Sequence, residues 1–282
     1  MLFFEYVKVT ENNGNMPKML ENSGGGYGTL LMTVYAVYKA VGSGGDRMID
    51  FRELPFHEDD LAELLQLEID FVFQPIFDTE KLEIIAYEAL MRPKGKSPLE
   101  LIDEYQKKDK LFVIELATCF GAAMEYRRRG YTKDICINSF PSEVLNLGQT
   151  ELFFKCFPEM EGRIIVEMLE YTKLNKHKWR EKQEEISTHD MRLALDDYST
   201  GNNDISAVEY FHPQYVKFDR TMISGIHEDE RKQKKVLELI QHFHGIGIKV
   251  VAEGIETEEE LNYLRYSTEM DYVQGYYLAV PR

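Results

Sequence analysis

The sequence is poor in cysteine, and it has no excess of positive charge. Its three cysteines, Cys119, Cys136 and Cys156, are odd in number and form no CxxC pair. This predicts reduced core residues of an intracellular protein rather than a disulfide framework. The formal net charge of −16 argues against bulk binding of DNA, RNA or an anionic membrane, because a polyanion is repelled at long range.

Long apolar segments are also missing. The longest, residues 27–41, has at most about 15 residues and is interrupted by Lys39, whereas a membrane span needs about 20. The N-terminus shows no signal-peptide pattern. These absences predict a cytoplasmic protein without a membrane partner.

Residues 1–56 differ in composition from the rest of the chain. They contain glycine- and asparagine-rich segments at 12–15, 24–26 and 42–45, which are typical of loops and linkers. Between the last two, apolar residues from Leu30 to Val41 are spaced to lie on one face of a short helix. We therefore expect an N-terminal extension of unknown role at 1–56, with one amphipathic helix, and a separate domain at 57–282.

From residue 57 onward, short apolar segments alternate with longer, charged amphipathic segments. Most of the apolar segments are continuous, as in strands buried on both faces. Eight strands are predicted, at 71–77, 83–90, 134–138, 163–168, 192–196, 215–218, 249–252 and 272–274. Helices are predicted at 99–129, 173–188, 228–243 and 258–266, the last with a capping box of Thr257 and Glu260.

This order of elements is typical of an α/β protein and predicts a (β/α)8 barrel of the TIM type. Only residues 78–82 separate the first two predicted strands. A parallel pair needs a crossover of a dozen or more residues. The first strand is therefore expected to be antiparallel.

Polar and mostly acidic residues end these apolar segments. A single acidic residue at a strand end is usually solvated or caps a helix. Here seven consecutive strands end in this way, and in a barrel those ends converge on the rim where active sites lie. The residues are Glu88, Asn138, Glu167, Asp196 with Asp197, Lys217, Glu253 and Gln274.

Carboxylates gathered on one rim repel one another and raise one another's pKa values unless cations neutralise them. Oxygen ligands favour hard cations such as Mg2+ or Mn2+ over Zn2+, which prefers cysteine and histidine. The adjacent Asp196 and Asp197 can bridge or flank two ions, and two ions about 3.5–4 Å apart suit attack of water on a phosphodiester. The pattern predicts a site for two divalent cations of a kind that suits phosphodiester hydrolysis.

The segments around these residues resemble the EAL family of bacterial phosphodiesterases, which act on cyclic di-GMP. Residues 87–93 (YEALMRP) resemble the signature motif, and Gln74-Pro75-Ile76 precedes it as in the family. Further matches follow in family order at 166–170 (VEMLE), 195–201 (LDDYSTG), 216–220 (VKFDR), 251–256 (VAEGIE) and 274–277 (QGYY). The resemblance covers about residues 57–282.

The resemblance implies a role for each motif residue. Two divalent ions, Mg2+ or Mn2+, are expected on Glu88, Asn138, Glu167, Asp196 and Asp197. Lys217 is expected to orient or polarise the attacking water. Glu253 is expected to act either as general base or as a water-mediated ligand. Together with Glu88 these two form the catalytic set.

Substrate contacts are implied for a further group: Gln74 with guanine, Arg92 with phosphate, and Leu90, Asp219 and Gln274 on the substrate side. Glu170 resembles the residue that anchors the Asp196–Asp197 loop, and Glu256 resembles a supporting residue outside the ligand set.

Three features depart from the family pattern. Tyr198 and Ser199 stand where the family has Phe and Gly, and Ser139–Phe140 stand where it usually has Leu-Ser. The chain also stops at Arg282, where family members usually continue into a final helix.

The implied function is hydrolysis of cyclic di-GMP to linear pGpG, which lowers a second messenger of bacterial motility and biofilm formation. A homodimer is compatible with the resemblance. The alternative is a catalytically silent EAL-like module that binds nucleotide or a protein partner. Degenerate relatives typically lose metal ligands, whereas this chain retains every acidic position as well as Asn138 and Lys217.

Overall fold

The structure is a computed structural model that describes residues 48–169, 175–198 and 205–282. The predicted helix at 30–41 and most of the predicted extension lie outside the described residues. So do Glu170 and Ser199. The predicted division into 1–56 and 57–282 stays a prediction.

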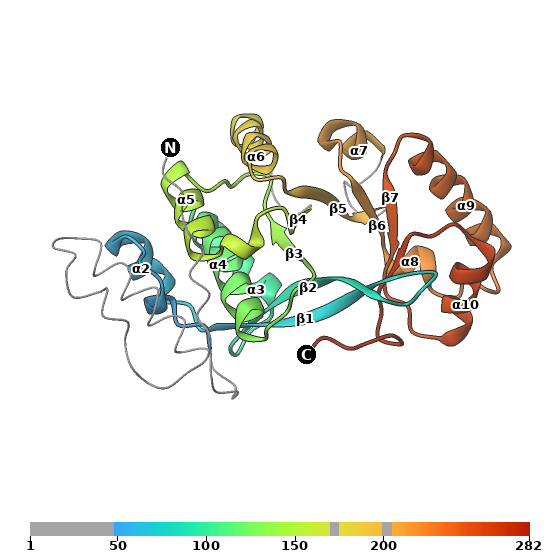
Figure 1. The fold of residues 1–282 in the computed structure, drawn as a ribbon, viewed down its shortest axis with the longest axis horizontal. Coiled ribbons are helices and arrows are strands. Elements are labelled where there is room, and N and C mark those ends of the chain that lie inside the picture. Colours follow the sequence, from blue (N-terminus) through green and yellow to red (C-terminus); the bar gives the residue numbers. More distant parts are fainter. Residues whose placement is uncertain (1–47, 170–174, 199–204) are drawn as a thin grey trace, which may run out of the picture. The chain divides into compact units, whose positions relative to one another are not determined.

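The described residues contain eight strands that close into a barrel, each strand hydrogen-bonded to the next and β8 to β1 (Figure 1). Strand β1 is antiparallel to both β2 and β8, and the other neighbouring pairs are parallel. This confirms the predicted TIM-like barrel with an antiparallel first strand. The strands are β1 (Ile69–Asp78), β2 (Ile84–Pro93), β3 (Asp134–Ser139), β4 (Ile164–Met168), β5 (Arg192–Tyr198), β6 (Tyr215–Phe218), β7 (Lys249–Ala252) and β8 (Tyr272–Val273).

A tight turn joins β1 to β2. The amide of Leu82 donates to the carbonyl of Asp78 (2.9 Å), and the Asp78 carboxylate accepts from the amide of Lys81 (2.8 Å). Leu82 has a φ of 54°, in the left-handed region. The short connection therefore reverses the chain, as its length predicted.

Strand β2 is longer than predicted, and Glu88 lies in its middle rather than at its end. Parallel pairing with β3 stops at Ala89, opposite Ile137, but β2 continues against β1 as far as Pro93, opposite Ile69. Strand β1, the hairpin partner, satisfies the backbone of residues 90–93 after the pairing of β2 with β3 has ended. Glu88 thus lies one residue before the end of the parallel pairing and not at the end of the strand.

Helices surround the barrel. The predicted helix at 99–129 is two helices, because the chain breaks at Asp109, which has a φ of 56°. The capping box of Thr257 and Glu260 is confirmed. The α-helices are α2 (Glu58–Leu64), α3 (Pro98–Lys107), α4 (Leu111–Arg128), α5 (Leu147–Cys156), α6 (Lys176–Thr188), α7 (Ile205–Phe211), α8 (Arg220–Ile223), α9 (Glu230–Gly245) and α10 (Glu258–Ser267), with 3-10 turns η2 (Phe51–Glu53) and η3 (Pro158–Met160). Among the described helices, none combines the length and apolar character of a membrane span.

Apolar residues pack on both sides of the barrel wall. Outside, one core lies between the first strands and α2–α6, and a second lies between the later strands and α8–α10. Tyr198, which replaces the family's Phe, belongs to the second core and packs on Phe218 and Phe243. Inside the barrel, an apolar plug is formed by Ile76, Ala86, Cys136, Ile165, Ala194 and Val251. This plug is the floor of the site described below.

The segment after β8 returns along β1. Phe73 and Arg282 exchange two backbone hydrogen bonds (3.0 and 3.1 Å), so residue 282 lies beside β1 (Figure 1). The carbonyl of Ala279 accepts from the side-chain amide of Gln74 (3.1 Å). The C-terminal segment therefore helps to hold a predicted substrate-binding residue.

Candidate active site

A ring of polar side chains lies next to the apolar plug. Each member lies in a strand or directly after one, two residues along the chain from a plug residue or from Tyr215 or Tyr272. Because residues two apart on a strand share a face, the ring residues point into the barrel as the plug does. They are Gln74, Glu88, Asn138, Glu167, Asp196, Lys217, Glu253 and Gln274. The structure thus brings the polar strand-end residues of the sequence to one mouth of the barrel.

Lys217 lies at the centre of this ring, with its side chain 2% exposed. Its Nζ is 2.6 Å from Glu253 Oε1, 2.9 Å from Asp196 Oδ1, 3.0 Å from Glu167 Oε1 and 3.5 Å from Glu88 Oε2. Burial by itself would lower the pKa of Lys217, but the four carboxylates outweigh it and raise that pKa well above its ordinary value. Lys217 is therefore a buried ammonium.

Glu167 is the most deeply buried carboxylate of the ring, with 0% of its side chain exposed. Burial raises its pKa to about 8; Lys217 acts against this, while Glu88 and Asp196 add to it. Among the described residues, neither carboxylate oxygen of Glu167 has a hydrogen bond of acceptable geometry. Its contact with Lys217 is an ion pair without the angles of a hydrogen bond.

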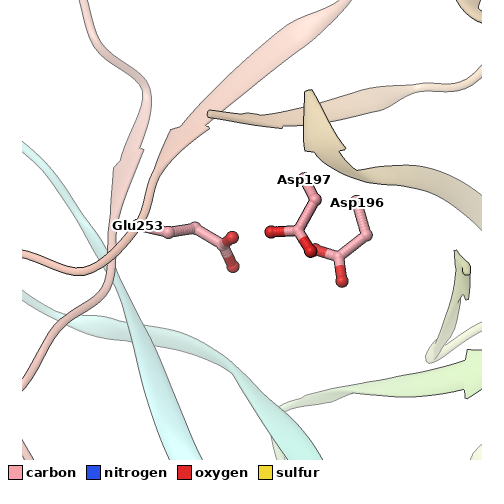
Figure 2. Close-up of side chains that lie close together, drawn as sticks. All are labelled: Asp196, Asp197 and Glu253. Carbon is pink, nitrogen blue, oxygen red and sulfur yellow. The ribbon is translucent and has the colours of Figure 1, made fainter. Parts of the chain in front are cut away.

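Three carboxylates come together beside Lys217. Asp196, Asp197 and Glu253 each place one oxygen within 4.8 Å of the others. Figure 2 shows the Glu253 carboxylate facing the two aspartates from the opposite side. Burial raises the pKa of Glu253 well above its ordinary value, and Lys217 offsets this only in part.

The backbone of β5 explains how two consecutive aspartates can face the same side. Neighbouring residues of a regular strand point to opposite faces. Asp197 instead has a φ of 49°, in the left-handed region, and the pairing of β5 with β6 shifts register between Leu195 and Tyr198. Such an irregularity redirects one side chain. It turns Asp197 toward Asp196 and Glu253.

The donor set fits hard divalent cations. The barrel mouth holds five carboxylates, all of them oxygen donors, and one ammonium to neutralise them. Apart from the ion pair of Oε1 with Lys217, the buried Glu167 carboxylate has no hydrogen bond in the described residues, and an incompletely satisfied buried carboxylate is costly. Oxygen-only sites select Mg2+, Mn2+ or Ca2+. The arrangement therefore suits the predicted cofactors.

A cavity of about 360 Å3 opens beside the ring. It is lined by seven residues that the sequence predicted, namely Gln74, Glu88, Leu90, Asp219, Glu253, Glu256 and Gln274. The Nε2 of Gln274 donates to Glu88 Oε2 (2.6 Å) and to Gln74 Oε1 (3.3 Å). These two bonds join β1, β2 and the residue after β8 at the cavity wall.

Four further lining residues had no predicted role: Arg220, Gly254, Gly275 and Tyr276. Arg220 forms an ion pair with Glu256, and a Cβ on Gly254 would lie 2.6 Å from the Arg220 side chain. Arg220 could have been identified from the sequence, because it directly follows Asp219 in the matched segment 216–220. Its pairing with a residue 36 positions away could not be seen there.

Among the described residues, six predicted site residues do not line the cavity: Arg92, Asn138, Glu167, Asp196, Asp197 and Lys217. Arg92 lies near the far end of β2, exposed, and its guanidinium donates to the carbonyl of its own neighbour Met91 (2.9 Å). Asn138 does not line the cavity, but it is the register partner of Glu167 in the ring. The substrate role of Arg92 stays a prediction.

The sequence model of the EAL domain family matches residues 58–281. This chain belongs to the EAL domain family. Its EAL domain is 25% identical over 216 residues to the cyclic di-GMP phosphodiesterase TpdA of Vibrio parahaemolyticus, covering 74% of this chain and 36% of TpdA. It is 30% identical over 234 residues to the probable cyclic di-GMP phosphodiesterase PdeD of Escherichia coli, covering 77% and 42%.

A third relative is named as an antirepressor and not as a phosphodiesterase. The blue light- and temperature-regulated antirepressor BluF of Escherichia coli is 24% identical over 211 residues, covering 73% of this chain and 52% of BluF. The chain thus spans about a third to a half of the length of these relatives.

Solved structures share the EAL barrel. A standalone EAL protein of Vibrio cholerae in its c-di-GMP-bound form superposes with a TM-score of 0.69 at 24% identity, covering 76% of this chain and 92% of that one. The manganese and cyclic di-GMP complex of Klebsiella pneumoniae BlrP1 superposes with a TM-score of 0.62 at 24% identity, covering 76% and 55%. At these identities the likeness shows the fold.

Proposed function

We propose that this EAL domain hydrolyses cyclic di-GMP to linear pGpG with two divalent cations, Mg2+ or Mn2+. The observation that carries the proposal is the Asp196, Asp197 and Glu253 cluster beside the Lys217 ammonium, next to a cavity of about 360 Å3. Related proteins named as cyclic di-GMP phosphodiesterases support the choice of substrate. Cytoplasmic location and a homodimer stay predictions.

In this proposal the ring residues Glu88, Asn138, Glu167 and Asp196, together with Asp197, hold the cations. The bound cations supply positive charge to a substrate that the acidic site would otherwise repel, and they lower the pKa of a bound water. The first effect is needed because the chain has a net charge of −16, which repels an anionic substrate.

The remaining steps belong to the chain's own side chains. The Lys217 ammonium donates a hydrogen bond that orients the attacking water or a phosphate oxygen. Glu253 takes the proton of the water, and burial favours this role because it raises the pKa of the Glu253 carboxyl above its ordinary value and so makes it a stronger base. A new O–P bond forms, the bond from phosphorus to the 3′ oxygen breaks, and that oxygen takes up a proton. Gln74, Leu90, Asp219 and Gln274 contact the nucleotide.

The test is an assay of the purified chain with cyclic di-GMP in Mn2+, Mg2+, Ca2+ or chelator, followed by chromatographic detection of pGpG. Product is expected with Mn2+ and Mg2+ and not with chelator. Ca2+ is expected to support binding without hydrolysis, because it prefers more ligands at longer distances than the octahedral ions do. Robust cleavage in Ca2+ alone would contradict the two-metal mechanism.

A matched pair of variants makes the assay specific. Glu88→Gln removes a ring carboxylate and is expected to abolish turnover, whereas Glu83→Gln changes an exposed residue just before the same strand and is expected to leave turnover unchanged. The antirepressor name of BluF favours testing the silent alternative as well. A protein that binds cyclic di-GMP in every condition without releasing pGpG would establish that alternative.

A further inference from the structure

A buried ion pair outside the barrel wall has no part in the proposed chemistry. Glu115 of α4 and Lys182 of α6 are 4% and 2% exposed, and Lys182 Nζ lies 2.7 Å from Glu115 Oε1. Neither residue lines the cavity beside the ring. Apolar residues of similar size often stabilise a core as well as a buried ion pair does. The pair therefore calls for a reason other than stability.

The pair holds the C-terminal end of β3. Ser139 Oγ donates to Glu115 Oε1 (2.6 Å), and the amide of Phe140 donates to Glu115 Oε2 (3.0 Å). Lys182 Nζ donates to Ser139 Oγ and to the carbonyl of Phe140 (2.8 Å). Ser139 and Phe140 are the positions at which the chain departs from the Leu-Ser of the family pattern. Phe140 contributes only its backbone amide and carbonyl, so the Ser139 hydroxyl is the side-chain group that β3 supplies to the network.

Two ring residues depend on the backbone that this network holds. Ser139 directly follows Asn138, so the two side chains leave β3 on opposite faces. Asn138 pairs in register with Glu167, and the carbonyl of Ser139 accepts from the amide of Leu169 (3.0 Å) at the end of β4. Hydrogen bonds to Ser139 and Phe140 therefore fix the strand ends that carry Asn138 and Glu167.

We propose that Glu115, Ser139 and Lys182 form a positioning network that sets Asn138 and Glu167 for divalent-cation binding. The proposal rests on the metal site of the proposed function. Groups that orient metal ligands from outside the ligand set typically change metal affinity by about 10–100-fold when they are removed. Through this network, the affinity for the cation depends on the packing of α4 and α6 against β3.

The experiment measures Mn2+ binding to the intact chain by calorimetry, without substrate. Ser139→Ala removes only the hydroxyl and is expected to weaken Mn2+ binding about 10-fold. Ser139→Thr keeps the hydroxyl and is expected to bind Mn2+ as the wild type does. The double variant Glu115→Gln with Lys182→Met removes both charges without leaving one unpaired. It is expected to weaken binding at least as much, and it serves as the test if Ser139→Ala does not fold.

Glu125→Gln is the matched control. Glu125 is also a buried glutamate of α4, 2% exposed and paired with Arg128 and Arg129. It lies ten residues further along the helix, which is about 15 Å. This variant is expected to lower the melting temperature without changing Mn2+ affinity.

The outcomes separate the two proposals. Wild-type affinity in both Ser139→Ala and the double variant would overturn the network and leave the proposed function standing. A wild-type chain that fails to bind Mn2+ would overturn the proposed function and the network together. Loss of affinity in Glu125→Gln equal to that in Ser139→Ala would show a general effect of stability and overturn the network.

Discussion

Lys217 Nζ lies 3.0 Å from Glu167 Oε1, and the two side chains are 2% and 0% exposed. Two buried charges at this distance attract strongly, but both have lost their hydration, so such a pair adds little net stability. Removing one partner, by contrast, strongly destabilises the folded protein, because the other charge is left buried and unpaired. The charge balance of the barrel mouth can therefore be tested by single substitutions.

Lys217→Met is expected to destabilise the metal-free protein by about 3–5 kcal/mol, because four carboxylates lose their shared cation. Mn2+ should restore part of this loss, so the rise in melting temperature on adding Mn2+ should be larger in the variant than in the wild type. Thermal unfolding with chelator and with Mn2+ measures both. Lys249→Met, an exposed lysine of the adjacent strand β7, is the control and should change neither. Equal stability of the Lys217→Met and wild-type proteins in chelator would contradict this account.

The pKa of Glu167, raised to about 8 by burial, predicts how stability depends on pH. Between about pH 4.5 and 8 the folded, metal-free protein holds a proton that the unfolded chain releases. Stability falls with rising pH wherever the folded state binds more protons. The chelated protein should therefore lose stability as pH rises through this window, and Glu167 alone contributes at most about 1.4 kcal/mol per pH unit to that loss.

Glu167→Gln removes this titration, so its unfolding free energy should vary less with pH than that of the wild type. Urea unfolding in chelator from about pH 5 to about pH 8 measures the difference between the two slopes. Mn2+ affinity of the wild type should rise over the same window, because the cation displaces the proton. Parallel stability curves for the two proteins would refute the assignment.

The sequence was sufficient to predict the barrel and most of the ring, because barrel strands buried on both faces are continuous apolar segments. Residues 164–166 before Glu167 and 250–252 before Glu253 are examples. The true length of β2 could not be predicted, because residues 90–93 are held only by pairing with β1, a tertiary contact. The break at Asp109 was missed because the charged residues 107–110 include no Gly or Pro that would mark the end of a helix.

The side-chain geometry of the site was less accessible to sequence reasoning. The pair Asp196–Asp197 was expected to act together, but a regular strand would have pointed them apart. The left-handed backbone of Asp197 turns the two side chains to the same side. It could not be predicted from the sequence, since aspartate is common in many backbone conformations. The ion pair of Arg220 with Glu256 likewise depends on how two barrel loops meet.

The backbone at Asp197 predicts a separation of stability from activity. Asp197→Asn should keep the fold, because asparagine tolerates a φ of 49°, and should lose turnover with the carboxylate. Asp197→Val should in addition destabilise the protein by about 1–3 kcal/mol, because a β-branched residue is strained there. The same two substitutions at Asp190, which has a φ of 54° in the turn before β5, should reproduce the stability difference with turnover unchanged. Full turnover of Asp197→Asn with Mn2+ would remove Asp197 from the proposed ligands.

The contact of Gly275 with Ile255 predicts that Gly275→Ala inactivates the site. A Cβ on Gly275 would lie 2.1 Å from the carbonyl oxygen and 2.3 Å from the amide nitrogen of Ile255, and backbone atoms cannot move aside as a flexible side chain can. The loop that carries Glu253 must therefore shift, and a displacement of about 1 Å at a reacting group can reduce turnover about 100-fold. Gly245→Ala is the control, because a Cβ at Gly245 in the last turn of α9 meets no atom within 4 Å. Turnover and melting temperature of both variants decide the matter: wild-type turnover in Gly275→Ala would show that Glu253 does not depend on this contact.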